Sequence, residues 1–194
     1  MTKNVLKSVL LAVVAVALLS FDYPMPENWF KAGSDPASYE MGTDAGAGQG
    51  GKNAATIKSI KNRIHGFGTL MQTCLPDKYL GKRVRMSGYL KTKDVAGWAG
   101  LWFRIDGQKS NSTLGFDNMK DGKKDRSIKG TTDWAKYEIV LDVPEKATNL
   151  AYGALLVKTG QIWFTDISFE VVDNSVPTTG SGSHDEPTNL NFDK

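Results

Sequence analysis

The sequence has little of what catalysis or metal binding by cysteine and histidine requires. It contains one cysteine, Cys74, and two histidines, His65 and His184, among 194 residues. A single cysteine excludes an internal disulfide. One cysteine and two histidines are also too few for a zinc site built from histidine and cysteine. Cys74 is expected to be a small buried apolar side chain. Because no nucleophile motif and no distinctive carboxylate pair is present, we expect no enzyme activity.

A strong charge of one sign is also missing. The formal net charge is +3, from 24 basic and 21 acidic residues. The basic residues are scattered among acidic ones, as on a solvated surface. We therefore expect no nucleic-acid partner and no electrostatic binding to an anionic membrane.

Long apolar stretches with helical periodicity are absent after residue 21, and the one long apolar run lies before it. Lys3 and Lys7 precede the run 9–19, which is shorter than the roughly 20 residues that span hydrocarbon. This layout is typical of a secretory signal peptide. We predict a signal peptide over residues 1–20 and a periplasmic or secreted chain. An uncleaved leader that anchors the chain in the membrane is the alternative.

The rest of the chain alternates short strand-like segments with turn residues. Many short strands without a helical segment predict an all-β fold, an antiparallel two-sheet β-sandwich over residues 21–173. Lys158–Gln161 has the composition of a tight hairpin. Residues 174–194, rich in small polar residues, are expected to be a disordered C-terminal tail. The expected strands after the glycine-rich loop at residues 42–51 are 54–60, 68–73, 83–93, 99–106, 113–116, 135–143, 150–158 and 161–172.

Two expected strands show which side chains share a face, because side chains alternate along a strand. In the last strand, Trp163, Ile167 and Phe169 fall on one face, and Ile162 and Phe164 on the other. Trp163 is expected in the core. So is Trp134, which lies beside another expected strand. In the segment 97–107, alternation separates an apolar set from an aromatic and charged set: Ala99, Leu101, Phe103 and Ile105 on one face, and Trp98, Trp102, Arg104 and Asp106 on the other.

The aromatic and charged face of this segment is a candidate ligand site. If residues 83–93 form the neighbouring strand, Arg85 and Tyr89 lie opposite the same face. Indoles stack on the apolar faces of sugar rings, and arginine and aspartate can bond to hydroxyl groups. The candidate ligand-binding residues are therefore Trp98, Trp102, Arg104, Asp106, Tyr89 and Arg85. The alternative is that another part of the chain covers the two indoles and leaves Arg104 and Asp106 as a solvated pair.

Three segments, at residues 79–91, 132–144 and 162–169, resemble strands of galactose-binding-domain-like jelly rolls, which include many carbohydrate-binding modules. Residues 79–91 resemble a strand of that fold that begins with Gly-Lys. Residues 132–137, followed by Val143-Pro144, are similar to its Thr-x-Trp strand. Residues 162–169 resemble its closing strand, with Thr165 in place of an aspartate. The resemblance implies a β jelly roll with a binding or scaffolding role and no catalytic residues.

Three further segments, 102–107, 116–119 and 130–134, resemble a bacterial subfamily of this fold. Its members are accessory modules beside exported peptidases, esterase-like domains or regulators. The resemblance therefore implies an accessory domain with a non-catalytic, binding or scaffolding role.

The loop that follows residue 116 is a candidate site for a structural calcium ion, which such jelly rolls often bind. Asp117, Asn118, Asp121 and Asp125 supply the oxygen ligands that calcium prefers. The spacing is not that of an EF-hand, and lysines crowd the segment. The alternative is a turn held by side-chain bonds from Asp117 and Asn118. No other cofactor is expected.

Together these features predict a non-catalytic exported module that binds a carbohydrate or a similar polar small ligand. The alternative is a protein-interaction or structural β-sandwich that has a partner protein and no small-molecule ligand.

Overall fold

The computed structural model describes residues 23–108 and 112–182, and its architecture is all-β, as predicted. None of the described helices is long and apolar enough to cross a membrane. The predicted signal peptide, residues 1–20, lies outside the described residues. Within the described residues, two short 3-10 helices, η1 (Pro36–Ser38) and η2 (Gln49–Gly51), accompany ten strands: β1 (Phe30–Gly33), β2 (Tyr39–Asp44), β3 (Ala54–Ser59), β4 (Phe67–Cys74), β5 (Lys82–Gly107), β6 (Thr113–Asp117), β7 (Ile128–Val143), β8 (Ala147–Val157), β9 (Gln161–Val172) and β10 (Ser181–Gly182).

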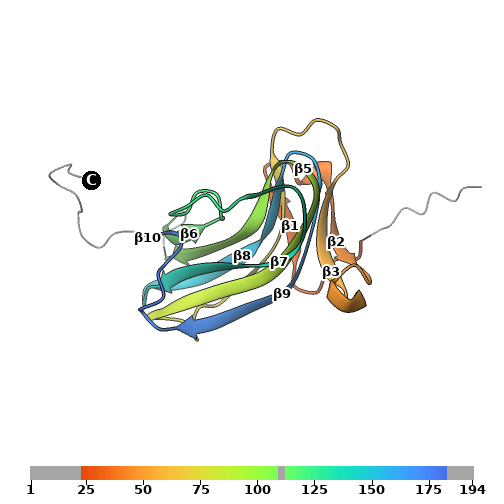
Figure 1. Ribbon diagram of the computed structural model, residues 1–194. Helices are drawn as coiled ribbons and strands as arrows, with labels where there is room; N and C mark the ends of the chain where they lie inside the picture. The colour runs from red at the N-terminus through yellow and green to blue at the C-terminus, as the bar shows by residue number, and fades with distance from the viewer. Residues whose placement is uncertain (1–22, 109–111, 183–194) are drawn as a thin grey trace, which may run out of the picture.

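The strands form a sandwich of two antiparallel layers that share β5. The first half of β5, residues 82–93, pairs with β7 and β9, and its second half, residues 98–107, pairs with β8 and β6. One layer therefore has the order β10-β6-β5-β8-β4-β1, and the other has β7-β5-β9-β3-β2. The sequence predicts two separate strands here. Instead, one strand bends at one end of the molecule, near Asp94, whose φ is 52° (Figure 1).

The core lies between the two layers. Ala99, Leu101, Phe103 and Ile105, the predicted apolar set of β5, are all fully buried. Trp29, just before β1, joins the layers: its ring centroid lies 5.9 Å from that of Tyr152 in β8 and 5.7 Å from that of Phe164 in β9. Contacts between aromatic rings at such distances stabilise a core beyond the effect of buried area alone.

A β-bulge interrupts the alternation of β9. Tyr89 of β5 pairs with Thr165, whereas Ser87 pairs with Ser168. Along this stretch β9 therefore advances three residues while β5 advances two. Asp166, inside the bulge, has a φ of 53°. An extra residue of this kind shifts every later side chain to the opposite face of the strand.

The bulge overturns the predicted faces of β9. Phe164 before it, and Ile167 and Phe169 after it, all pack against the main core. The predicted grouping of Trp163 with Ile167 and Phe169 is therefore wrong. Trp163 is only half-buried, and so is Trp134; neither belongs to the main core, contrary to expectation.

The predicted hairpin at Lys158–Gln161 is also wrong. β8 pairs with β4 and β5, whereas β9 pairs with β3 and β5, so the turn passes from one layer to the other. Gly160 has a φ of 133°, which favours glycine. Its carbonyl oxygen accepts a hydrogen bond from the Ser59 N–H (2.9 Å), and the carbonyl oxygen of Thr159 accepts one from the Ala96 N–H (3.0 Å).

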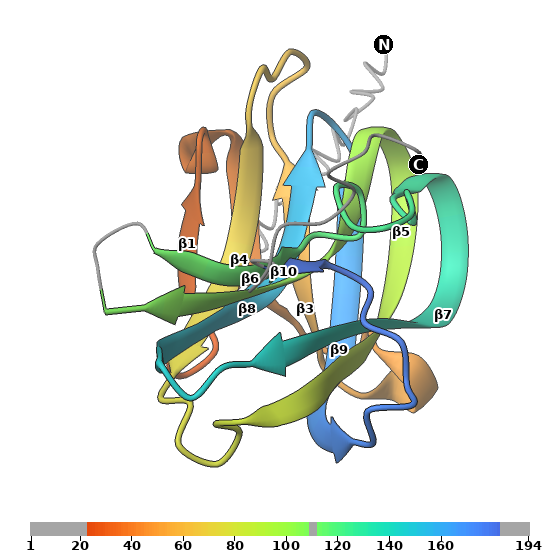
Figure 2. The ribbon, with the colours of Figure 1, turned by 90° about the vertical axis from the view of Figure 1, so that its left-hand side faces the viewer.

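The segment 174–182 crosses the edge formed by β6 and β7. Nη1 of Arg83 donates to two carbonyl oxygens of this segment, at 2.6 and 2.7 Å. The Thr179 N–H donates to the carbonyl oxygen of Val140 in β7 (2.9 Å), and β10 then pairs with β6 (Figure 2). The predicted disordered tail is therefore wrong for residues 174–182, and residues 183–194 lie outside the described residues.

Tyr39 makes the stability of the fold sensitive to alkaline pH. Its side chain is 4% exposed, and its hydroxyl donates to the carbonyl oxygen of Lys158 (2.9 Å). Burial, with a smaller contribution from Asp35, raises the pKa of Tyr39 to about 12. The unfolded chain loses this proton near pH 10, before the folded chain does. The contribution to stability, on the order of 2 kcal/mol, is therefore present below pH 10 and lost between pH 10 and 12.

We expect the free energy of unfolding, measured by urea denaturation, to fall across this pH range. The Tyr39→Phe variant should show a shallower fall, because its side chain has no proton to lose. An equally steep fall in the variant would contradict the assignment to Tyr39.

Candidate ligand-binding cavity

One outer face of the sandwich carries a cavity of about 450 Å³. It lies on the layer that contains the second half of β5, on the side away from the main core. Five strands contribute to its walls, and most of the side chains that line it are aromatic or aliphatic. The lining residues are Ala32 and Gly33 of β1, Phe67, Thr69 and Met71 of β4, Trp98, Trp102 and Arg104 of β5, Phe116 of β6, Leu155 and Val157 of β8, and Asn118.

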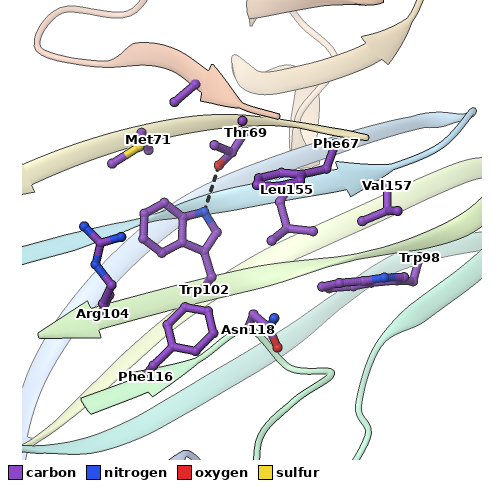
Figure 3. Close-up of a pocket in the computed structure, with 12 residues that line it drawn as sticks. Phe67, Thr69, Met71, Trp98, Trp102, Arg104, Phe116, Asn118, Leu155 and Val157 are labelled. Carbon is purple, nitrogen blue, oxygen red and sulfur yellow. Dashed lines mark hydrogen bonds between the residues drawn. The ribbon is translucent and has the colours of Figure 1, made fainter. Parts of the chain in front are cut away.

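The indole of Trp102 forms the middle of the cavity floor (Figure 3). Its Nε1 donates to Oγ1 of Thr69 in β4 (2.8 Å), and that hydroxyl donates to the carbonyl oxygen of Ala154 (2.7 Å). Since β8 lies between β5 and β4, the indole spans β8 to reach Thr69. The residue of β8 that pairs with Trp102 is Gly153, which has no side chain to obstruct it. The floor is thus held in one orientation.

The two predicted indoles face the same side but differ in exposure. Trp102 is 6% exposed and forms a small apolar cluster with Ala151 and Leu155, separate from the main core. Trp98 is half-buried at the edge of this cluster. Figure 3 shows Trp98 at one end of the cavity and Arg104 at the other. Trp98 is therefore the indole with more surface left for a ligand.

Arg104 is held at its end of the cavity by a bidentate ion pair. Its Nε and Nη2 donate to the two carboxylate oxygens of Asp106, at 2.8 and 3.1 Å. Nδ2 of Asn149 donates to the same carboxylate (3.0 Å). Arg104 lines the cavity, whereas Asp106 lies behind it and fixes the plane of the guanidinium. The predicted pair thus exists, with Asp106 as the residue that positions Arg104.

The structure does not bring Arg85 and Tyr89 to this cavity. Both lie on the first half of β5, where they pair with β7 and β9 in the other layer. The predicted arrangement opposite Trp98 and Trp102 is wrong, because the bend of β5 separates its halves. The outer face of that other layer carries ion pairs instead: Arg83–Asp142, Arg85–Glu170, Lys91–Asp133 and Lys136–Glu138.

Sequence reasoning missed eight of the residues that line the cavity, and the largest of these are Phe67, Met71, Leu155 and Phe116. None lies on the same strand as Trp102, so only the pairing of strands brings them to its indole. The sequence of β8 contains a signal that could have found one of them. Its residues from Leu150 to Val157 are apolar or small on both faces, which is typical of a strand covered on both sides.

The carboxylate of Asp117, the last residue of β6, is paired with an arginine in the loop that follows, Arg126. This carboxylate is fully buried; it accepts a hydrogen bond from the Met119 N–H (2.7 Å) and forms an ion pair with Arg126. Nη1 of Arg126 also donates to the carbonyl oxygen of Glu138 (2.6 Å). The positive charge that the buried carboxylate requires is therefore supplied by Arg126.

Asn118 and Asp121 continue this loop. Oδ1 of Asn118 accepts from the N–H groups of Lys120 (3.0 Å) and Asp121 (2.7 Å), and its Nδ2 donates to the Asp121 carboxylate (2.9 Å). The alternative prediction, a turn held by side-chain bonds, is confirmed. Within residues 23–108 and 112–182, no group of three or more acidic, histidine or cysteine side chains is arranged to hold a metal ion. Calcium at Asp117, Asn118 and Asp121 stays a prediction.

The residues considered for nucleophilic chemistry lie apart from the cavity. Cys74, at the end of β4, is half-buried rather than fully buried, and burial raises the pKa of its thiol. A raised pKa keeps the thiol in its protonated, poorly nucleophilic form. His65 is exposed before β4. Neither residue lines the cavity.

The chain is 42% identical over 173 residues to the uncharacterized HTH-type transcriptional regulator YbfP of Bacillus subtilis (strain 168). This match covers 87% of the chain and 57% of the regulator, so the chain spans little more than half the length of this curated relative. No protein-family model matches the sequence.

Two solved structures are similar in fold. The enzymatically active domain of tailspike protein 4 from bacteriophage CBA120 has a TM-score of 0.57 at 13% identity, over 75% of this chain and 20% of that one. The CBM22-1 xylan-binding domain of Xyn10C from Paenibacillus barcinonensis has a TM-score of 0.52 at 14% identity, over 79% of this chain and 91% of that one. At these identities the likeness establishes the fold alone.

Proposed function

We propose, from the β-sandwich fold that this chain shares with carbohydrate-binding modules, that it is a non-catalytic module that binds a carbohydrate. The ligand lies in the cavity on the outer face of β4, β8 and β5. Trp98 and Trp102 stack against its sugar rings, and Arg104 bonds to its polar groups.

The observation that carries this proposal is the contrast between the two outer faces. One face is covered by ion pairs whose carboxylates are exposed to solvent, as on an ordinary solvated surface. The other has an aromatic floor, an aliphatic wall and one oriented guanidinium. Sugar rings have apolar faces bordered by hydroxyl groups, so a concave aromatic surface with a few fixed polar groups matches their chemistry.

The related proteins support a binding module but leave its ligand open. The xylan-binding domain is named for a polysaccharide ligand, and the match covers 91% of that domain and 79% of this chain. The B. subtilis relative is named as a transcriptional regulator, and the chain matches just over half of it. A module that recognises a small ligand is compatible both with a polysaccharide-binding protein and with a transcriptional regulator. We propose export to the periplasm or the medium from the leader-like residues 1–20.

Affinity electrophoresis tests the proposal directly. The purified chain is run through native gels that contain xylan, galactan or glucomannan, and we expect retardation by at least one of them. Trp98→Ala should strongly reduce the retardation. Removal of a half-buried indole costs about 1.5 kcal/mol of ligand contact, which is roughly a tenfold rise in Kd.

Trp134→Ala is the matched control, because Trp134 is also half-buried but does not line the cavity. It should keep the retardation of the unmodified chain. Equal loss in both variants, or no retardation in any gel, would contradict binding at this cavity.

One observation favours a protein ligand instead of a sugar. Phe30 of the edge strand β1 is 44% exposed and pairs with Met71, so the apolar surface continues beyond the cavity to the edge of the layer. A large exposed apolar patch often marks a protein interface. If the partner is a second copy of the chain, its apparent mass in size-exclusion chromatography should rise with concentration, and Phe30→Asp should lower it. Under this alternative, neither the unmodified chain nor the variant is retarded by any polysaccharide.

A further inference from the structure

This inference rests on the proposed function and narrows its ligand. We propose that the cavity accepts a sugar acid, a glycan unit that bears a carboxylate, and that Arg104 binds this carboxylate. The proposal is carried by the orientation of one guanidinium and by the kinds of hydrogen-bonding groups that remain unused around the cavity.

Arg104 is the one charged side chain among the described residues that line the cavity. Its side chain is 42% exposed, whereas that of Asp106 behind it is 23% exposed. A ligand in the cavity therefore meets the guanidinium before it meets the carboxylate. The ligand and Asp106 lie on different edges of the same cation, which a planar guanidinium accommodates without displacing either.

The edge of the guanidinium that remains unused has the geometry of a carboxylate fork. Nε and Nη2 of Arg104 each give one hydrogen to Asp106. The hydrogens left over are both of those on Nη1 and the second one on Nη2. Among the described residues, Nη1 has no hydrogen-bond partner. Parallel hydrogens on Nη1 and Nη2 match the two oxygens of a carboxylate, and such bidentate pairs are stronger than bonds to a hydroxyl.

The other polar side chains of the cavity also offer donors rather than acceptors. Nε1 of Trp102 is occupied by Thr69, but Nε1 of Trp98 makes no hydrogen bond to the described residues. Oδ1 of Asn118 already accepts two backbone bonds, while its Nδ2 gives only one hydrogen, to Asp121. Every hydroxyl group of a neutral sugar brings a proton to donate, and few cavity side chains could accept that proton. A carboxylate is an acceptor only, so it suits these groups.

The position of Arg104 is also prepared in advance. Asp106 fixes the plane of the guanidinium, and Nδ2 of Asn149 in β8 donates to Oδ2 of Asp106, the oxygen that also accepts from Nη2 of Arg104. A preformed arginine loses less side-chain entropy when a ligand binds than a mobile one does. The aromatic floor beside it excludes water from one side of the contact, which strengthens a charged hydrogen bond.

The test compares acidic and neutral ligands of the same size. Trimers of galacturonate, glucuronate and mannuronate, and the neutral trimers of the corresponding sugars, are titrated into the full chain. Binding is followed by tryptophan fluorescence. We expect at least one uronate trimer to bind at least tenfold more tightly than its neutral counterpart. We also expect this preference to shrink as NaCl is raised.

Two substitutions assign the preference to Arg104. Arg104→Gln should bring the ratio between acidic and neutral trimers close to one, and Arg104→Lys should keep only part of it, because lysine retains the charge but not the fork. Lys120→Gln, which removes a cation from the neighbouring loop without touching the cavity, should leave the ratio unchanged. The Arg104→Gln/Asp106→Asn double variant removes both charges together and should behave as Arg104→Gln does.

The possible outcomes separate the two proposals. Neutral trimers that bind as tightly as the acidic ones overturn the sugar-acid proposal and leave carbohydrate binding intact. A preference that survives Arg104→Gln overturns the role of Arg104. Failure of every trimer, acidic and neutral, to change the fluorescence counts against carbohydrate binding itself.

Discussion

Replacing Asp117 with alanine is expected to lower the free energy of unfolding by about 3–5 kcal/mol. The carboxylate is fully buried, it holds the Met119 N–H, and it is paired with Arg126. Alanine would leave a guanidinium that is partly buried without its counter-charge, and a buried N–H without its acceptor. The loss is measured by urea denaturation followed by circular dichroism, and in a thermal scan Tm should fall by about 10 °C.

Asp125→Ala is the matched control on the same loop. Asp125 is exposed, and the hydroxyl and N–H of Ser127 hold its pKa at about 2. Exposed pairs contribute little to stability, so this variant should unfold close to the original midpoint. A similar loss in both variants would show that the loop tolerates no substitution and that the buried pair has no special role.

Trp102→Ala should have the second largest effect, a loss of about 3 kcal/mol or more in the free energy of unfolding. The indole is 6% exposed, and its replacement leaves a void between β5 and β4 beside Leu155. Ligand binding should be lost together with stability, because the same ring forms the cavity floor. Trp98→Ala should lose binding while it keeps most of the stability, since Trp98 is only half-buried.

Thr69→Val separates the hydrogen bond of Trp102 from its packing. Valine has nearly the shape of threonine but cannot accept the bond from the indole N–H, so the unpaired group should cost about 1–3 kcal/mol. The indole remains in place and binding should be largely kept. If Trp102→Ala were no more destabilising than Thr69→Val, the packing role assigned to the ring would be wrong.

Part of the candidate site could be predicted from the sequence, namely the residues that share one face of a single strand. Alternation along residues 98–106 correctly placed Trp98, Trp102 and Arg104 on one face, because that inference depends only on the local geometry of a strand. The assignment of Arg85 and Tyr89 to the same site required knowing which strands are neighbours. It failed because β5 bends between its two halves and places them in different layers.

The fold divides in the same way. The composition and the turn residues determined that the chain is a β-sandwich, and they placed most strands close to where they lie, since both signals are local. Only the tertiary structure decided that Lys158–Gln161 joins two layers and that the bulge at Asp166 turns Ile167 and Phe169 toward the core. It also decided that Phe67, Leu155 and Phe116 close around Trp102. Strand neighbours and bulges depend on hydrogen bonds between residues far apart in the chain, and no local pattern encodes those partners.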